Sequence, residues 1–439
     1  MARRIMLRAG KTPYHPYSHE ETLRRNLLGT NSGNLVFSEA AWRLLSTRDT
    51  RVTSAGLGAS AKKAAEINAD FDHLVLPFAN AFRVSFRKSL DRYSEMIEKL
   101  RVPVTVLGVG AQTDLDYSGG NLDPIRKATT RFVRAVLERS PAIGVRGEFT
   151  YAFLRKLGFS DDQVTVIGCP SVYYYGPDLP ALRHPETLDR NSRISMNVSP
   201  YVPGIGAMFE ANMRHYPDLI YVPQNNESLD QLLWAGANID PKAKVFPRAI
   251  DHPVFTEDRI RLFIDPQSWF KALRERDFSF GTRIHGNIAA LLAGTPAFVL
   301  AHDSRTLELA RYFEIPHMQY SEIGARRLAE DFYATADYRG YHANHAARFD
   351  TFTRFLDRCG LRHVYMADED RGQAFDARMD STDFPEALPA LQHQSPVHVA
   401  QRLNWLRQRN ETEATELRAQ IKQLKEALAK LQKSVSVKS

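Results

Sequence analysis

The chain has 439 residues, and its 58 Lys and Arg against 51 Asp and Glu give a net charge of +7. This composition is that of an ordinary globular protein and excludes a disordered or low-complexity one. With only Cys169 and Cys359, the chain can form neither a disulfide framework nor a Cys-rich zinc site. The first residues lack the apolar segment of a signal peptide, and no apolar run is long enough to span a bilayer, so we expect a cytoplasmic protein.

The positive charge is concentrated near the C-terminus. From Ser395 onward, 9 Lys and Arg stand against 4 Glu, a net +5, which leaves +2 for the rest of the chain. A nucleic-acid-binding face would need basic residues interleaved with aromatic ones across a folded domain, and the bulk of the chain lacks that pattern. We therefore expect no nucleic-acid partner.

Short apolar runs alternate with longer helical patterns in the first part of the chain, which is typical of βαβ units and parallel sheets. Residues 1–175 are thus expected to form an N-terminal Rossmann-like domain. The expected strands begin at His73, Val104, Ala142 and Val164, and the expected helices cover residues 86–99, 124–138 and 150–157.

Prolines and polar residues after Pro170 interrupt this pattern and indicate a connection between domains. A second α/β series follows, and residues 191–325 are expected to form a second Rossmann-like domain in a GT-B-like arrangement, with ligands bound between the carboxyl ends of strands. Residues 326–400 form a C-terminal extension of no evident pattern. The expected strands of the second series begin at Arg193, Leu219, Lys244, Arg259, Phe278 and Ala297.

Residues 401–439 predict a basic helical tail. Its apolar residues recur in steps of three and four, the pattern of a short coiled coil. A helix of this length is marginal alone in water, so we expect a homo-oligomer joined through the tail. Two alternatives are a helix docked on its own domain and a basic helix bound peripherally to anionic lipid. The apolar positions are Ala414, Leu417, Ile421, Leu424, Leu428, Leu431 and Val435.

The stretch from Phe278 to Pro316 carries the clearest chemistry. A buried strand is expected to end in Gly-Thr-Arg-Ile-His-Gly, with a helix starting at Asn287, so that Arg283 and His285 point to one side of the strand end. Backbone N–H groups at the helix start and the arginine fork favour an anion, and the histidine can exchange a proton near neutral pH. The alternative is that Arg283 pairs with an acid and His285 caps the helix.

The order of these features, Arg-x-His-Gly, an Ala-rich helix, Gly-x-Pro, a strand and then Asp303 before a helix, resembles the polysaccharide pyruvyl transferase family. Three other stretches agree in order: NSGNLVFSEA from Asn31, LGVGAQ from Leu107, and AIGVRGEFTYAFLRKLGFSDDQVTVIGCPS from Ala142. The resemblance covers roughly residues 26–320 and leaves out the tail.

This resemblance implies a transferase that moves the pyruvyl group of phosphoenolpyruvate onto two hydroxyls of a sugar, in a polysaccharide or its precursor, forming a ketal and releasing phosphate. It needs no metal and no cofactor beyond this donor. Arg283 and His285 are then the donor-binding and catalytic pair, with His285 as the candidate acid or base and Gly286 and Asn287 beside them. Arg146 is implied as a second cation for the donor.

Further polar residues are candidate contacts to acceptor or donor, although helix capping or loop polarity explains them equally well. They are Asn31, Ser32, Asn34, Gln224 and Glu227.

Three more residues have structural interpretations. Asp303 is expected to cap a helix and Cys169 to be a packed thiol. Glu148 is expected either to act at the site or to occupy a helix first turn. The stretch GVGAQ lacks the third glycine of a dinucleotide fingerprint, so a Rossmann cofactor is not expected.

Two other functions fit the same architecture. One is a GT-B glycosyltransferase with a nucleotide-sugar donor, because fold alone does not fix chemistry. The other is a non-catalytic scaffold that recruits partners through the tail, which the presence of Arg146, Arg283 and His285 in their motifs disfavours. The acceptor sugar and its linkage cannot be read from the sequence.

Overall fold

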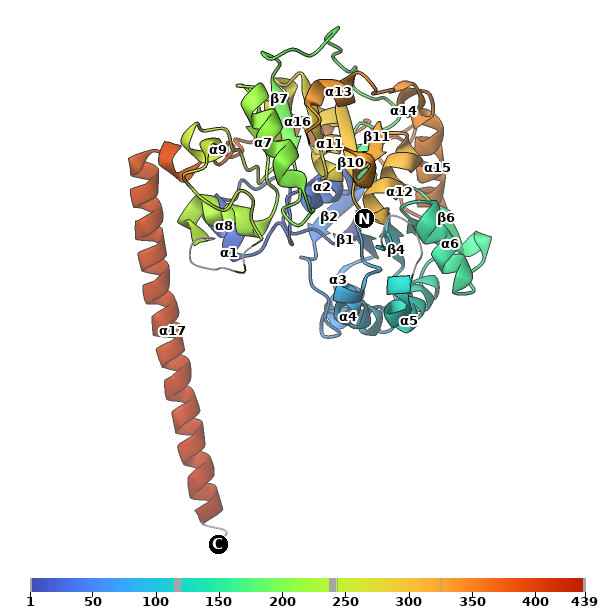
Figure 1. Cartoon of the computed structure of the whole chain (residues 1–439). Coiled ribbons are helices and arrows are strands. Elements are labelled where there is room, and N and C mark those ends of the chain that lie inside the picture. Colours follow the sequence, from blue (N-terminus) through green and yellow to red (C-terminus); the bar gives the residue numbers. More distant parts are fainter. Residues whose placement is uncertain (1, 114–119, 237–241, 243, 325, 437–439) are drawn as a thin grey trace. The chain divides into compact units, whose positions relative to one another are not determined.

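The computed structural model describes residues 2–113, 120–236, 242, 244–324 and 326–436. The chain forms two compact units, residues 1–390 and residues 391–439. The first unit contains two parallel sheets with helices on both faces of each, so it is an α/β structure with two Rossmann-like domains (Figure 1).

The first sheet has the strand order β2-β1-β3-β4, all parallel. Two further parallel strands, β5 and β6, continue it, because Val109 just beyond β4 pairs with Val145. The sequence patterns indicate the last four strands but not the first two. The β1 segment begins with two arginines, and the β2 segment consists mainly of polar residues, with every second residue exposed. The strands are β1 (Arg3–Leu7), β2 (Thr50–Ser54), β3 (His73–Pro77), β4 (Val104–Leu107), β5 (Ile143–Val145) and β6 (Val164–Val166).

Alternate residues of β3 separate the two faces of this sheet. Leu74 and Leu76 pack with one group of helices, whereas Val75 packs on the opposite side with α2 (Gly33–Leu45). Such alternation is expected because successive side chains of a strand point to opposite faces. The first group contains α3 (Lys63–Asp70), α4 (Arg87–Ile97), α5 (Arg126–Leu137) and α6 (Glu148–Lys156).

The second sheet has the order β11-β10-β9-β7-β8, again all parallel. The runs from Lys244 and Arg259, expected as strands, form none. Pro247 cannot donate to a ladder, and the other run pairs only through isolated bridges at Ile260 and Leu262. The strands are β7 (Ile194–Asn197), β8 (Ile220–Tyr221), β9 (Phe278–Gly281), β10 (Ala297–Ala301) and β11 (His317–Gln319).

Helices cover both faces of the second sheet as well. One face carries α7 (Ile205–His215), α8 (Asn226–Trp234) and α13 (Ala329–Tyr333). The other carries α10 (Pro266–Arg274), α11 (Ile284–Leu292) and α12 (Ser304–Phe313). Shorter helices are α1 (His19–Arg24) and α9 (Pro253–Thr256).

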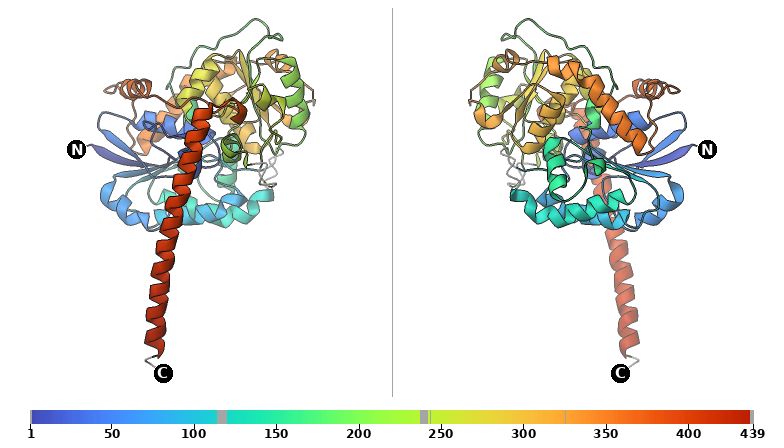
Figure 2. Two further views of the ribbon diagram at one scale, coloured as in Figure 1. Left: turned by 90° about the vertical axis from the view of Figure 1, so that its left-hand side faces the viewer. Right: turned by 90° about the vertical axis from the view of Figure 1, so that its right-hand side faces the viewer.

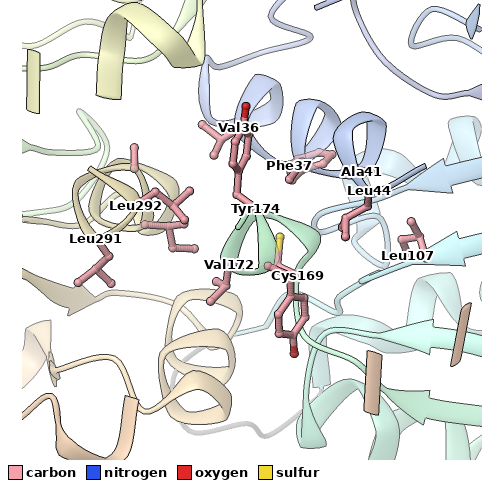
Figure 3. Packing of buried hydrophobic residues seen from close by; sticks show 14 of the residues in the cluster. Val36, Phe37, Ala41, Leu44, Leu107, Cys169, Val172, Tyr174, Leu291 and Leu292 are labelled. Atoms are coloured by element: carbon pink, nitrogen blue, oxygen red, sulfur yellow. The ribbon is translucent and has the colours of Figure 1, made fainter. Parts of the chain in front are cut away.

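Helix α2 lies in a core that the two sheets share. Nearly all of its residues are buried, and Figure 3 shows Val36 and Phe37 facing the segment from Cys169 to Tyr174, with Leu292 of α11 beside that segment. The two Rossmann-like domains are therefore joined by a continuous hydrophobic cluster in addition to the chain connection.

The extension after the second sheet belongs to this first unit up to residue 390, ten residues short of its expected end. Phe352 and Phe375 are buried in the shared core, and Arg43 of α2 forms a 2.6 Å ion pair with Asp376. The helices of the extension are α14 (Arg339–Ala343), α15 (His345–Arg358) and α16 (Gln373–Asp380).

The second unit contains one long helix, α17 (Pro396–Ser436), which begins five residues before the expected tail (Figure 2). Four apolar residues of the predicted coiled-coil seam are at least half exposed: Leu417, Ile421, Leu424 and Leu428. The side chains of Leu431 and Val435 lie outside the described residues. Across the described part of the chain, no helix combines the length and apolar character needed to cross a membrane.

Candidate active site

The two sheets place a cavity at their carboxyl edges. In the first sheet, β2 lies on one side of β1 and β3 on the other; in the second sheet, β8 and β9 flank β7 in the same way. The order of the strands therefore reverses between β1 and β3 and between β7 and β9. Ligands of open α/β sheets bind outside the carboxyl ends at such a switch point. A cavity of about 690 Å³ lies there, lined by Thr30, Asn31, Asn34, Ala79, Asn80, Arg83, Val84, Ser85, Gln112, Arg146, Tyr201, Gln224, Asn225, Glu227, Lys244, Thr282, Arg283, Ile284, His285, Arg305 and Thr306.

The turn after β9 brings Arg283 and His285 to this cavity. Gly281 has φ +149°, and a Cβ there would collide with the carbonyl oxygen of Asn197 on β7. Helix α11 starts at Ile284, three residues earlier than expected, so Arg283 is its extended N-cap residue and His285 lies in its first turn. The two side chains therefore reach the cavity from a helix start and not from alternate positions of a strand.

Arg283 has neutral side-chain partners. Its Nη2 donates to Oδ1 of Asn225 and its Nη1 lies 3.5 Å from the hydroxyl of Tyr201, while its backbone N–H donates to Oδ1 of Asn197. Among the described residues no carboxylate forms an ion pair with it, so the alternative of an acidic partner does not hold. Burial lowers the pKa of Arg283, and its positive charge is left for a ligand.

Arg146, directly after β5, is the most deeply buried cation of the cavity. Only 1% of the residue is exposed, and its Nε and Nη2 have no hydrogen-bond partner within the described part of the chain. Glu308 lies nearby, but its carboxylate accepts from the backbone N–H and the hydroxyl of Thr150, and burial raises its pKa to about 7. A buried guanidinium without a partner is costly, so this geometry favours an anionic ligand.

His285 is packed against Cys169 and Phe37. Its Nε2 lies 3.5 Å from Sγ of Cys169, and its ring centroid is 5.5 Å from that of Phe37. Burial lowers the pKa of His285 well below its ordinary value, and the nearby Arg146 and Arg305 lower it further. The imidazole is therefore neutral at pH 7, because burial disfavours its charged form. In this form it can accept a proton but is a poor proton donor.

Two arginines of the cavity escaped the sequence analysis. Arg305 lies in the first turn of α12, in a 2.6 Å ion pair with Asp303. Arg83 follows β3, and its buried Nε has no hydrogen-bond partner among the described residues. Burial and Arg305 lower the pKa of Arg83 to about 10. Their positions in the sequence could have identified them, because each arginine follows the carboxyl end of a predicted strand.

The helix-capping expectations are confirmed. Oδ1 of Asp303 accepts from the backbone N–H of Thr306 at the start of α12, 3.0 Å away. Burial opposes ionisation of Asp303, but Arg305 outweighs it and lowers the pKa to about 2. Glu148 is the exposed first residue of α6, which suits the helix dipole. Cys169 is buried, as expected of a packed thiol, and also contacts His285.

Four of the five expected polar contacts line the cavity: Asn31, Asn34, Gln224 and Glu227. Asn31 also binds the first residue of α2, since its Oδ1 accepts from the backbone N–H of Gly33. Ser32 is buried away from the cavity, and its backbone N–H donates to the carbonyl of Gln224.

Gly286 and Asn287, expected beside the donor, do not line the cavity. Gly286 leaves space for Gln224 and Asn197, because a Cβ would meet both. Nδ2 of Asn287 donates to the carbonyl of Gly281, and its Oδ1 accepts from Asn197. These residues shape the turn that carries Arg283.

The cavity combines helix N-termini with several positive side chains. Helices α2, α11 and α12 all begin at the cavity, and helix N-termini favour negative charge. The positive side chains that line the cavity are Arg83, Arg146, Lys244, Arg283 and Arg305, whereas Glu227 is the acid among the lining residues.

Fold and site together define a two-domain, GT-B-like α/β enzyme with a cavity lined by positive side chains between its sheets. A family model then gives the particular family: residues 31–304 match the model of polysaccharide pyruvyl transferase, and the chain belongs to that family. The protein is therefore a transferase of polysaccharide biosynthesis.

Solved structures similar to this chain include sugar-nucleotide enzymes. A putative UDP-N-acetylglucosamine 2-epimerase from Listeria monocytogenes is 12% identical, with 88% of this chain and 99% of that chain covered and a TM-score of 0.41. The UDP-GlcNAc 2-epimerase of Methanocaldococcus jannaschii is 10% identical, with 81% and 99% covered and a TM-score of 0.44. HepE of Anabaena, in complex with UDP and glucose, is 10% identical, with 87% and 100% covered and a TM-score of 0.39. No curated protein matched the chain.

Proposed function

We propose that the enzyme transfers the pyruvyl group of phosphoenolpyruvate onto two hydroxyls of a sugar, in a polysaccharide or its precursor. A cyclic ketal forms and phosphate is released. The observation that carries this proposal is the buried, unpartnered guanidinium of Arg146 facing the same cavity as Arg283. We propose a cytoplasmic reaction, since phosphoenolpyruvate is a metabolite of that compartment.

The charges of the donor match the arginines of the cavity. Phosphoenolpyruvate carries a carboxylate and a phosphate, and a guanidinium fork can bind either in a bidentate way. Arg146, Arg283 and Arg305 approach from different strand ends, so they can hold the two groups apart and oriented. Their charge also stabilises the departing phosphate, so the scheme requires no cofactor.

The cavity leaves room for the acceptor. A three-carbon phosphate fills only part of a volume of about 690 Å³. Asn31, Asn34, Gln224 and Glu227 line the same cavity and offer amide and carboxylate groups for sugar hydroxyls. Neutral His285 can hydrogen-bond an acceptor hydroxyl and orient it.

A nucleotide-sugar donor is the alternative. It would need a surface on which the base can stack, and Tyr201 is the one Phe, Tyr or Trp among the described residues that line the cavity. The guanidinium of Arg283 already lies 5.5 Å from the centroid of that ring. The lining therefore favours phosphoenolpyruvate.

We propose that α17 pairs with α17 of a second copy in a parallel coiled coil. Leucine at position d with an isoleucine at position a favours two strands. In a parallel pair Glu413 at position g faces Arg418 at position e of the second copy, whereas an antiparallel pair would bring Arg418 near Lys425. The seam has Ala414, Ile421 and Leu428 at a, and Leu417 and Leu424 at d.

The donor assignment is tested by turnover. The purified enzyme is incubated with phosphoenolpyruvate and a panel of methyl hexopyranosides, and phosphate release and product mass are followed. A sugar product heavier by one pyruvyl group supports the proposal. Transfer of a hexose from a nucleotide sugar, with no pyruvylated product, would refute it.

A further inference from the structure

Tyr201 lies at the mouth of the cavity, on the loop that follows β7, the strand that pairs with β9. It lines the cavity and is 47% exposed, so it can reach a bound ligand. The cation of Arg283 lies over the face of its ring, 5.5 Å from the centroid, which fixes the ring's direction.

The hydroxyl of Tyr201 lies between two guanidinium groups. Nη1 of Arg283 is 3.5 Å from the phenolic oxygen and Nη2 of Arg305 is 3.4 Å from it. A guanidinium only donates hydrogen bonds, so the oxygen of Tyr201 accepts from both arginines and neither uses its proton. This proton is available to a ligand held by the same arginines.

His285 is less suited to donate a proton. Its imidazole is buried against Cys169 and Phe37, and its lowered pKa leaves it neutral at pH 7. For Tyr201, burial raises the pKa, but Arg283 and Arg305 together bring it below the ordinary value of a tyrosine. The phenol is thus a stronger acid than a free tyrosine.

We propose that Tyr201 is the proton donor that protonates the methylene carbon of phosphoenolpyruvate, a role that rests on the proposed function. The O–H bond breaks, the electrons of the carbon–carbon double bond form the new C–H bond, and the adjacent carbon becomes an oxocarbenium-like centre. The first sugar hydroxyl attacks that centre and returns its proton to the phenolate. The second hydroxyl replaces phosphate, which leaves with its bonding electron pair and takes the second proton.

The titratable neighbours of Tyr201 have pKa values far from neutral pH. Asp303 has a pKa of about 2 and His302 a pKa of about 4, whereas that of Arg83 is about 10. None of these groups changes charge between pH 6 and pH 8. The charged and titratable groups that face Tyr201 are Arg83, Arg283, His302, Asp303 and Arg305.

The test is Tyr201→Phe, which keeps the ring over Arg283 and removes only the hydroxyl. Calorimetry with phosphoenolpyruvate should give a Kd within about threefold of the wild type, because the arginines remain. Loss of the vinyl proton signals of phosphoenolpyruvate in D₂O, and ketal formation with methyl hexopyranosides, should slow by about 100-fold or more. In the wild type, kcat should fall at high pH as the phenol ionises. In Tyr201→Phe, which has no phenol, this fall should be absent.

Tyr365→Phe is the matched control. Its hydroxyl also accepts from a guanidinium, 2.6 Å from Nη1 of Arg43, but lies outside the cavity. This variant should turn over at the wild-type rate.

Three results would overturn the proposal. One is wild-type turnover by Tyr201→Phe, and another is a change confined to KM with the pH profile unchanged, which would make Tyr201 a positioning residue for Arg283. The third is a wild-type enzyme that binds phosphoenolpyruvate yet neither exchanges its vinyl protons nor transfers it. No phosphoenolpyruvate binding by the wild type would instead refute the proposed function itself.

Discussion

Oδ1 of Asn197 accepts a hydrogen bond, 3.1 Å long, from the backbone N–H of Arg283, and so links the end of β7 to the start of α11. Its Nδ2 donates to Oδ1 of Asn287, 2.9 Å away. Asn197→Ala leaves two buried groups without these partners, and we expect a loss of about 2 kcal/mol in the free energy of unfolding and weaker donor binding. Urea unfolding and calorimetry measure the two effects.

Ser279→Ala is the graded control for that variant. Its hydroxyl also donates to Oδ1 of Asn287, but over 3.3 Å, and the bond between Asn197 and Arg283 remains. A loss as large as that of Asn197→Ala would show that the link to Arg283 is unimportant.

In the ligand-free protein, the buried charge of Arg146 should lower the free energy of unfolding. Replacing this buried, unpartnered cation by Met is expected to raise the free energy of unfolding by about 1–3 kcal/mol and to abolish donor binding. The measurement is best made at pH 6, where Glu308, with a pKa of about 7, is mostly protonated. Arg131→Met, at an exposed arginine paired with Glu98, should change stability little. A destabilised Arg146→Met protein would contradict this account of the site.

Gly33 sets the distance between α2 and His285. A Cβ at this position would lie 2.8 Å from Cβ of His285 and 2.9 Å from Oδ1 of Asn31. Gly33→Ala should therefore displace the imidazole, lower the free energy of unfolding by about 1–3 kcal/mol and reduce turnover. Gly58→Ala, where nothing lies within 4 Å, should leave both unchanged. Equal free energies of unfolding and equal turnover of the two variants would show that α2 can shift to make room for the added Cβ.

Glu39 should make stability depend on pH. Burial raises its pKa from 4.5 to about 7, while the hydroxyl of Tyr174 and the amide of Gln267 donate to Oε1, and the buried Lys11–Asp265 pair lies nearby. The folded state holds this proton more tightly than the unfolded one. Its stabilisation is present below pH 4.5 and is lost as the pH rises towards 7, by on the order of 2–3 kcal/mol.

Thermal unfolding of the wild type and Glu39→Gln between pH 5 and pH 8 checks this. The variant should become more stable than the wild type, or less destabilised, as the pH rises. The comparison separates Glu39 from buried histidines such as His73, whose lowered pKa gives the opposite slope below pH 6.5. If the difference in thermal stability between the two proteins does not change from pH 5 to pH 8, Glu39 does not titrate in this range.

Deleting the chain from Ala414 onward should lower the mass in solution to that of one copy. The full chain has a mass of 49.8 kDa, so light scattering distinguishes a dimer from a monomer. Arg418→Glu should weaken a parallel dimer, because the new carboxylate faces Glu413 of the second copy, and adding Glu413→Arg should restore it. A truncated protein with the mass of the full oligomer would refute pairing through α17.

Regular patterns made much of the fold predictable. β3, β4, β9 and β10 are compact apolar runs at expected positions, and the turn motif around Arg283 led to the family. The run of β1 was not recognised, because its arginines mask the apolar alternation. The early start of α11 was also missed, because a strand end and a helix first turn share the same residue types.

The electrostatics of the site could not be read from the chain. His285 is neutral because Phe37, Cys169 and Arg146, distant in sequence, surround it in the fold. Tyr201 gains its two arginine neighbours in the same way, from the start of α11 and from α12. Burial and charge proximity are tertiary properties, so a motif gives the residue types but not their protonation.

Calorimetric titration of the purified protein with phosphoenolpyruvate, alongside a panel of nucleotide sugars, tests the central claim most directly. The account predicts that phosphoenolpyruvate binds, that the nucleotide sugars do not replace it, and that Arg283→Ala abolishes the binding while its unfolding curve stays close to that of the wild type. Binding of a nucleotide sugar alone would contradict the pyruvyl donor and assign the cavity to glycosyl transfer.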